Sequence, residues 1–259
     1  MIDRASTAAV LNQPPAAPYS PLLSLKSGTE WPPIFMVHGL GGSPSEFLGL
    51  ARDIGVPSPI FGIQERGLDG THKPLETVEE MADVYVGAIA QIQATGPYLL
   101  VGHSFGGLVT LEMARALSAK GKRVGLLAML DAYPHASRLP AAQRIRLLGR
   151  RAMRRLAGYS APDDPGPQSV RKSMSPAKQR VRESTYRALR KYQPQFYDGS
   201  IKFIRATVAT NFPDPRVFWP RLATKFELDT VPGDHLAMLS AHSKSLASVL
   251  NRHLKDVLC

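Results

Sequence analysis

Cysteine is almost absent from this chain of 259 residues, because the only one is the last residue, Cys259. One cysteine cannot form a disulfide within the chain, and it excludes structural zinc sites built from several thiolates. No metal-ligand cluster or cofactor motif is found elsewhere. The sequence also lacks an apolar run of the about 18 to 20 residues that a membrane span needs. Residues 1–20 form a leader rich in Pro and Ala, without the basic start and apolar stretch of a secretory signal. We therefore expect a cytoplasmic protein with no cofactor.

Acidic residues are scarce in the middle of the chain. Between Arg138 and Lys191 there are 15 Lys and Arg and only three acidic residues, whereas the rest of the chain is nearly balanced, with 17 basic and 18 acidic residues. A basic surface attracts polyanions such as nucleic acid, anionic membranes, phosphorylated cofactors or acidic proteins. The alternative is a solvated helical face without a partner.

Short apolar runs alternate with amphipathic segments over most of the chain, which indicates a mostly parallel sheet covered by helices on both faces. Residues 77–80 match a capping box that opens one of these helices. The segment 135–198 has no clear strand and is predicted to be a helical lid inserted into a single domain, residues 21–259. The predicted strands are 34–37, 59–63, 98–101, 124–130, 201–208 and 226–231, and the predicted helices are 43–54, 77–93, 107–120, 140–156, 177–192 and 243–257.

The run Gly102-His103-Ser104-Phe105-Gly106-Gly107 fits the pattern G-x-S-x-G. It lies between a predicted buried strand and a predicted helix, where a nucleophile elbow belongs in an α/β-hydrolase fold. The turn is too sharp for side chains at its flanks, which accounts for the glycines. Ser104 is therefore the candidate nucleophile.

A serine nucleophile needs a base and an acid that orients the base. In this fold the histidine follows the last strand, which selects His235 among the seven histidines. Two aspartates between Ser104 and His235 follow predicted strands, Asp131 and Asp214, and both stay open at this point. Asp131 is the preferred acid because it directly follows its strand.

The reaction of a serine nucleophile also requires donors for an oxyanion. The Phe105 N–H is one candidate donor. The other is expected from the loop 38–42, where we choose the Leu40 N–H. Phosphate binding is the alternative role of this glycine-rich loop, but the spacing of a dinucleotide or Walker motif is missing.

The sequence resembles the thioesterase domains that end nonribosomal peptide and polyketide synthases, and their stand-alone relatives. The resemblance rests on PIFMVHGLGG (33–42), IFGIQERGLDG (60–70), GPYLLVGHSFGG (96–107), LLAMLDAYP (126–134) and VPGDHLAML (231–239). It implies an α/β-hydrolase fold and a triad of Ser104, Asp131 and His235. Some stand-alone relatives place the acid after a later strand, which keeps Asp214 under consideration.

The resemblance implies a serine thioesterase of secondary metabolism that releases an acyl or peptidyl group from a phosphopantetheine carrier protein or coenzyme A. We expect a stand-alone enzyme, since no carrier domain precedes the match, and neither a nucleic-acid partner nor a membrane span. The basic lid is predicted to dock an acidic carrier or the phosphates of coenzyme A. Substitution of several of its arginines by glutamate tests this prediction, at Arg150, Arg151, Arg154 and Arg155. The alternatives are a carboxylesterase or lipase and a non-catalytic acyl-binding protein.

Overall fold

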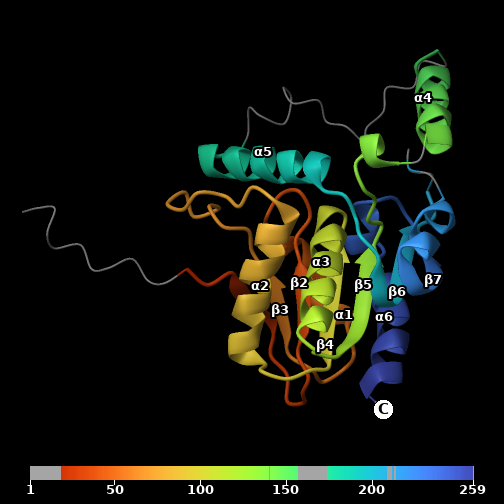
Figure 1. Cartoon of the computed structure of the whole chain (residues 1–259). Coiled ribbons are helices and arrows are strands. Elements are labelled where there is room, and N and C mark those ends of the chain that lie inside the picture. Colours follow the sequence, from red (N-terminus) through yellow and green to blue (C-terminus); the bar gives the residue numbers. More distant parts are fainter. Residues whose placement is uncertain (1–18, 140, 157–173, 209–211, 213, 259) are drawn as a thin grey trace, which may run out of the picture.

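A seven-stranded sheet forms the centre of the molecule (Figure 1). The computed structural model describes residues 19–139, 141–156, 174–208, 212 and 214–258. The strand order is β1-β3-β2-β4-β5-β6-β7, and all neighbours are parallel except β1, which runs antiparallel to β3. The strands are β1 (Leu22–Lys26), β2 (Ile34–Val37), β3 (Ile60–Ile63), β4 (Tyr98–His103), β5 (Val124–Leu130), β6 (Tyr197–Ala206) and β7 (Ala223–Val231).

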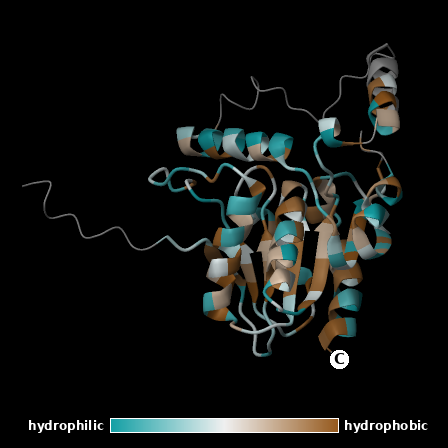
Figure 2. Cartoon of the chain, viewed as in Figure 1, coloured by the Kyte–Doolittle hydropathy of each residue, from teal (hydrophilic) through white to brown (hydrophobic). Residues whose placement is uncertain are grey.

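Helices cover both faces of the sheet, as the alternation of segments predicts (Figure 1). The helices are α1 (Leu48–Asp53), α2 (Val78–Ile92), α3 (Phe105–Ala119), α4 (Ala141–Leu156), α5 (Pro176–Lys191) and α6 (Ser243–Leu258). One buried cluster joins the sheet to α2 and α3, and a second joins the opposite face to α1 and α6. The strands are mainly apolar and the outward faces of the helices mainly polar (Figure 2). The predicted α/β-hydrolase architecture is confirmed.

Local sequence signals account for several element boundaries. The capping box predicted at the start of α2 is present: Thr77 Oγ1 accepts the Glu80 N–H at 3.1 Å, and Glu80 Oε2 accepts the Thr77 N–H at 3.2 Å. These two bonds satisfy backbone donors that have no partner within the helix. The segment predicted as one helix over 43–54 is instead a 3₁₀ helix, Pro44–Phe47, followed by α1.

Other boundaries differ from the prediction. Strand β1 was not predicted, because its five residues at the sheet edge are only partly buried and carry no alternating pattern. Strand β6 begins four residues earlier than expected, and β7 three residues earlier. Helix α3 begins at Phe105 rather than Gly107. Gly106 and Gly107 have low helix propensity, but they lie in the first turn of α3 because a side chain at either position would overlap neighbouring atoms.

Helices α4 and α5 lie between β5 and β6 in the chain, where the lid was predicted. Helix α5 crosses above the end of the sheet from which the loops after the strands emerge (Figure 1). Its buried residues include Val181, Ser184, Thr185 and Ala188, so one face of α5 is packed on the loops below. The predicted leader, residues 1–20, lies mostly outside the described residues, as do residues 157–173 and Cys259. In the described part of the chain, no helix is long and apolar enough to cross a membrane.

Two helical glycines have opposite surroundings, which gives a test of the packing. A Cβ on Gly107 of α3 would overlap the Ala132 methyl group, whereas a Cβ on Gly87 of α2 meets nothing within 4 Å. We expect Gly107→Ala to lower the free energy of unfolding by about 1 to 3 kcal/mol through overpacking. Gly87→Ala should raise it by up to about 1 kcal/mol, because alanine is the better helix former. Urea denaturation measures both, and equal effects of the two variants would contradict the packing described.

Candidate active site

Ser104 occupies the sharp turn between β4 and α3. Its backbone has φ 55° and ψ −120°, which is unusual for a residue with a side chain and indicates local strain. The Ser104 N–H donates to the Leu130 carbonyl of β5 at 2.8 Å, which holds the turn against the sheet. A Cβ on Gly102 would collide with the Gly106 carbonyl, and a Cβ on Gly106 would collide with the Val37 carbonyl. Both glycines are therefore required by the close approach of α3 to β2 and β4.

Asp131 follows the last residue of β5, next to the end of β4. It is completely buried, and its backbone has φ 47°, the second positive φ of a non-glycine residue in the described chain. Its N–H donates to the Ile204 carbonyl of β6 at 2.9 Å. Because β4, β5 and β6 are parallel neighbours, Ser104 and Asp131 leave the sheet at the same edge.

His235 lies on the loop after β7, and its ring contacts Asp131. Nδ1 of His235 is 2.8 Å from Oδ2 of Asp131, across 104 positions of the chain. A carboxylate oxygen accepts, so Nδ1 carries the proton and Nε2 is left to accept one. The turn that contains His235 is fixed by Asp234, whose carboxylate accepts the N–H groups of Leu236 and Ala237. These bonds hold the pKa of Asp234 below its usual range and engage its carboxylate away from the His235 ring.

His103, the residue before Ser104, connects the elbow to the loop of His235. Its Nε2–H donates to the His235 carbonyl at 3.1 Å, and the two rings lie with centroids 4.7 Å apart. On the other side, Nδ1 of His103 is 3.4 Å from Oε1 of Glu46, which also accepts the Gly39 N–H at 2.8 Å. Burial alone would raise the pKa of Glu46, but the contacts with His103 and Gly39 hold it below its usual value.

This connection was not predicted from the sequence. His103 was seen only as part of the elbow motif, and Glu46 had no local signal, because its partner His103 lies far away in the sequence. The bonds bring three loops together: the one after β2, the elbow, and the one after β7. Ser104 and His235 are therefore held on the same side of the sheet edge.

The two predicted oxyanion donors belong to the loop after β2 and to the start of α3. Phe105 is the first residue of α3, so its N–H has no carbonyl one turn before it to bond. Leu40 lies in a turn closed by the Gly42 N–H and the Gly39 carbonyl at 3.1 Å. The Leu40 carbonyl accepts from Thr185 Oγ1 of α5 at 2.9 Å. The loop that carries Leu40 is therefore held by α5 as well as by its own turn.

The structure places Asp214 in a different local role. Its carboxylate caps the 3₁₀ helix Pro215–Val217, accepting the Arg216 N–H at 2.9 Å, and it pairs with the Arg216 guanidinium at 2.7 Å. The hydrogen bonds from Arg216 hold the pKa of Asp214 below its usual range. His235 contacts Asp131 and not Asp214. Among the described residues, no group of three or more His, Cys, Asp or Glu side chains could hold a metal ion.

The arrangement can activate a hydroxyl nucleophile. A histidine oriented by a buried carboxylate can take a proton at Nε2, and free N–H groups can stabilise an oxyanion beside the serine. Such chemistry suits displacement at a carbonyl or phosphoryl centre.

Substitution of each candidate acid by asparagine shows which of the two supports the reactivity of Ser104. In Asp131→Asn the side chain no longer stabilises a protonated His235, so we expect the labelling rate of Ser104 by a fluorophosphonate to fall by about 10³- to 10⁴-fold. Asp214→Asn removes a capping carboxylate that faces Arg216, and the rate should change less than about threefold. Ser104→Ala lacks the hydroxyl that reacts with the fluorophosphonate and therefore gives the background labelling rate. A larger loss in Asp214→Asn than in Asp131→Asn would reverse the assignment.

Comparison with known proteins gives the family of this fold and site. The family model described as "Thioesterase domain" matches residues 32–254. Malpibaldin synthetase of Mortierella alpina is 30% identical over 232 residues, which cover 88% of this chain and 4% of the synthetase. A dimodular nonribosomal peptide synthase of Bacillus subtilis is 42% identical over 114 residues, 44% of this chain and 5% of the relative. The chain therefore spans only a small part of the length of these synthetases.

Solved structures show the same fold. A four-domain nonribosomal peptide synthetase bound to AMP and glycine has a TM-score of 0.72 at 23% identity, over 90% of this chain and 20% of that one. The type II thioesterase BorB from the borrelidin biosynthetic cluster has a TM-score of 0.66 at 21% identity, over 90% and 97% of the two chains. The predicted resemblance is confirmed by the family match.

Proposed function

Because the chain belongs to the thioesterase domain family, we propose that it releases an acyl or peptidyl group from a phosphopantetheine carrier protein or coenzyme A through an acyl-serine intermediate. Membership of the family supports hydrolysis of a thioester in general. The observation that carries the finer proposal is the Asp131–His235 hydrogen bond, formed beside the Ser104 elbow by residues far apart in the chain.

In the first step His235 acts as the general base. Nε2 takes the proton of Ser104 while Oγ attacks the thioester carbonyl, and Asp131 stabilises the imidazolium that forms. The charge that develops on the carbonyl oxygen is stabilised by the N–H groups of Leu40 and Phe105. Collapse of the tetrahedral intermediate breaks the carbon–sulfur bond. His235 returns the proton to the thiolate, which leaves as the carrier thiol.

In the second step the acyl group is transferred from Ser104. Water enters, His235 removes its proton, and the same two N–H groups stabilise the second tetrahedral intermediate. Collapse of that intermediate restores the Ser104 hydroxyl and releases the acid. A hydroxyl or amine of the substrate can replace water where the lid excludes solvent, which yields a cyclic or transferred product.

Substrates that differ only in the leaving atom test the proposal. Thioester and oxygen-ester pairs with identical acyl groups should show a higher kcat/KM for the thioester. Ser104→Ala should reduce turnover to the background rate, because no acyl-enzyme can form. Thiol release is measured in a Cys259→Ser background, so that the terminal thiol does not react with the detection reagent. A preference for the oxygen ester would favour a carboxylesterase, and equal labelling of wild type and Ser104→Ala by a fluorophosphonate would exclude the catalytic serine.

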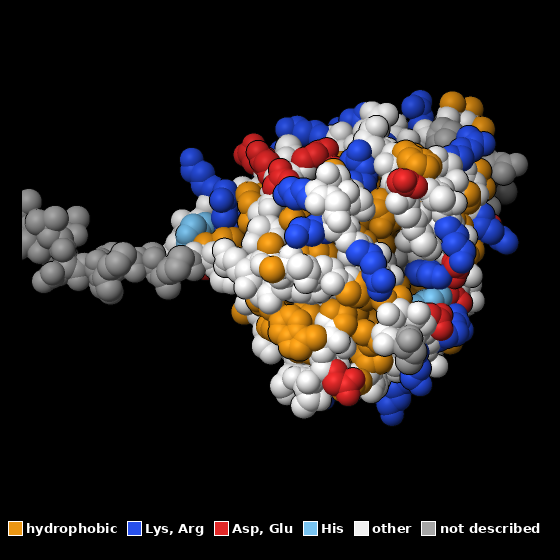
Figure 3. Space-filling view, turned by 60° about the horizontal axis from the view of Figure 1, so that its bottom comes forward, with side chains coloured by type: hydrophobic (Ala, Val, Ile, Leu, Met, Phe, Trp, Pro, Cys, Tyr) orange, Lys and Arg blue, Asp and Glu red, His pale blue; other side chains and the backbone are white. Residues whose placement is uncertain are grey.

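We further propose that the basic lid selects the carrier. Helix α5 has six basic residues and one acidic residue, and Lys178, Arg187 and Lys191 are exposed. The arginines first singled out, 150, 151, 154 and 155, have side chains outside the described residues. On the lower face of the molecule, basic and acidic side chains are interspersed (Figure 3). A concentrated basic face on α5 would attract an acidic carrier protein.

Charge reversal on two helices separates this role from a general charge effect. Arg187→Glu together with Lys191→Glu should raise KM for an acyl-carrier substrate about tenfold at low salt, because complementary charges steer the encounter. KM for the matching acyl-pantetheine should stay unchanged. The control is Lys244→Glu with Lys255→Glu on α6, which makes the same change in net charge. Equal effects of the two double variants would contradict a docking role for α5.

A further inference from the structure

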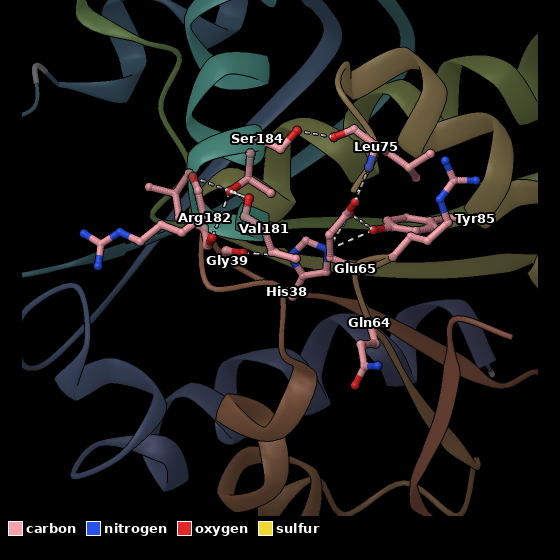
Figure 4. A network of polar contacts seen from close by, with 12 residues as sticks. His38, Gly39, Gln64, Glu65, Leu75, Tyr85, Val181, Arg182 and Ser184 are labelled. Atoms are coloured by element: carbon pink, nitrogen blue, oxygen red, sulfur yellow. Dashed lines mark hydrogen bonds and ion pairs between the residues drawn. The ribbon is translucent and has the colours of Figure 1, made fainter. Parts of the chain in front are cut away.

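A buried polar cluster contacts Gly39, the residue before Leu40 (Figure 4). It consists of His38, Glu65 and Tyr85, each with no exposed surface. None of the three takes part in the mechanism above. Burying a carboxylate is unfavourable unless its charge and hydrogen bonds are satisfied, so the contacts of this cluster require an explanation.

The contacts form one continuous chain. Nδ1 of His38 is 2.7 Å from the Gly39 carbonyl, and Nε2 is 2.9 Å from the Tyr85 hydroxyl. That hydroxyl is 2.5 Å from Oε2 of Glu65, and the remaining oxygen, Oε1, accepts the Leu75 N–H at 2.9 Å. Burial and the nearby Glu65 raise the pKa of Tyr85 well above its usual value, so its hydroxyl keeps its proton.

The number of protons in this chain is fixed by its hydrogen bonds. A carbonyl only accepts, so the bond to Gly39 needs a proton on Nδ1 of His38. The His38–Tyr85 contact needs a second proton and the Tyr85–Glu65 contact a third. A neutral imidazole, a phenol and a carboxylate together supply only two. For all three bonds to form at once, the cluster needs one extra proton, which would make its net charge zero and suit its complete burial.

The first bond of the chain also determines where the Leu40 N–H points. The Gly39 carbonyl and the Leu40 N–H belong to one peptide group, and in a trans peptide they point in opposite directions. The described cis bonds are at Pro32 and Pro97, so this peptide is trans. A carbonyl held toward the core by His38 and by the Gly42 N–H turns the Leu40 N–H away from the core.

We propose that His38, Tyr85 and Glu65 are positioning residues that aim the Leu40 N–H at the oxyanion, and that they do so with a shared extra proton. This rests on the proposed function, in which Leu40 is an oxyanion donor. The chain continues to the lid, because the Leu75 carbonyl accepts from Ser184 Oγ of α5 at 2.7 Å (Figure 4). The oxyanion loop and the lid are thus supported by the same buried contacts.

A pair of buried tyrosines provides the test of positioning. Tyr85→Phe removes the hydroxyl that bridges His38 and Glu65 and leaves only their direct 3.5 Å contact between Nε2 and Oε2. We expect kcat for the thioester to fall by about 10- to 100-fold, approaching the loss of an oxyanion donor. KM should change less than about threefold. The matched control is Tyr98→Phe, which removes another buried hydroxyl bond, to the Gln93 carbonyl at 2.8 Å, at the opposite end of β4. A folded Tyr85→Phe enzyme with the kcat of the control would overturn the proposal.

The rate of Ser104 labelling by a fluorophosphonate is measured in parallel, since its phosphoryl oxygen uses the same donors and no thioester is involved. If wild type labels but does not cleave thioesters, the proposed function fails while positioning is still tested. In that case a slower Tyr85→Phe supports positioning, and a rate equal to that of Tyr98→Phe overturns it.

Glu65→Gln tests the proton count. The amide can donate to the Tyr85 oxygen, which frees the Tyr85 proton for Nε2 of His38, so all three bonds form without an extra proton. We expect Glu65→Gln to keep kcat within about threefold of wild type, in contrast to Tyr85→Phe. A loss as large as that of Tyr85→Phe would overturn the count.

The protons can also be observed directly. Nitrogen-15 NMR of the imidazoles, assigned with His38→Gln, and isotope-edited infrared spectra of Glu65 report the two ends of the chain. At neutral pH an imidazolium with a carboxylate, or an imidazole with a carboxylic acid, gives three protons and supports the proposal. A neutral imidazole with a carboxylate gives two and overturns it.

Discussion

The close approach of α3 to the sheet is the constraint on which the site depends. The backbones of β2, β4 and α3 are so near one another at the elbow that side chains at Gly102 and Gly106 have no room. The chain can then turn only through the strained conformation of Ser104. That turn places His103 beside the His235 loop and leaves the Phe105 N–H free at the start of the helix. The positions of the proposed nucleophile, base and one oxyanion donor therefore depend on a single packing arrangement.

The polar contacts around the elbow make the site one connected unit. Glu46 holds Gly39, His103 holds the carbonyl of His235, and Asp131 holds its ring. The two bonds to His235 join residues 132 and 104 positions apart, so the geometry of the site is set by the folded sheet and not by any one loop. Electrostatic stabilisation of a transition state requires such groups to be in place before the reaction.

The sequence was informative where chemistry depends on local pattern. The elbow motif located Ser104, and chain order located His235, because both follow from the position of a residue relative to its strand. Asp131 and Asp214 both follow strands, so spacing left both open. Asp131 was preferred because it directly follows its strand, and the resemblance agreed with that choice. Asp214 contacts Arg216, a near neighbour in the sequence, but the sequence alone does not show the geometry of this contact.

Local sequence patterns could not predict the buried cluster of His38, Glu65 and Tyr85. Glu65 and Tyr85 are 20 positions apart, and an acid in the run Gln64-Glu65-Arg66 is typical of a solvated loop. Their burial arises because α2, α5 and the loop after β3 meet above the sheet edge. The start of α3 was predicted two residues too late for a similar reason, because the low helix propensity of its glycines is outweighed by tertiary packing.

Two hydroxyl groups of α5, those of Thr185 and Ser184, donate to backbone carbonyls, those of Leu40 and Leu75. A carbonyl is present whatever side chain a residue has, so substitutions at these two positions leave the acceptors of the anchor in place. Only Ser184 and Thr185 must keep their hydroxyl groups. The side chains at positions 40 and 75 can therefore diversify over evolutionary time while α5 keeps these two bonds.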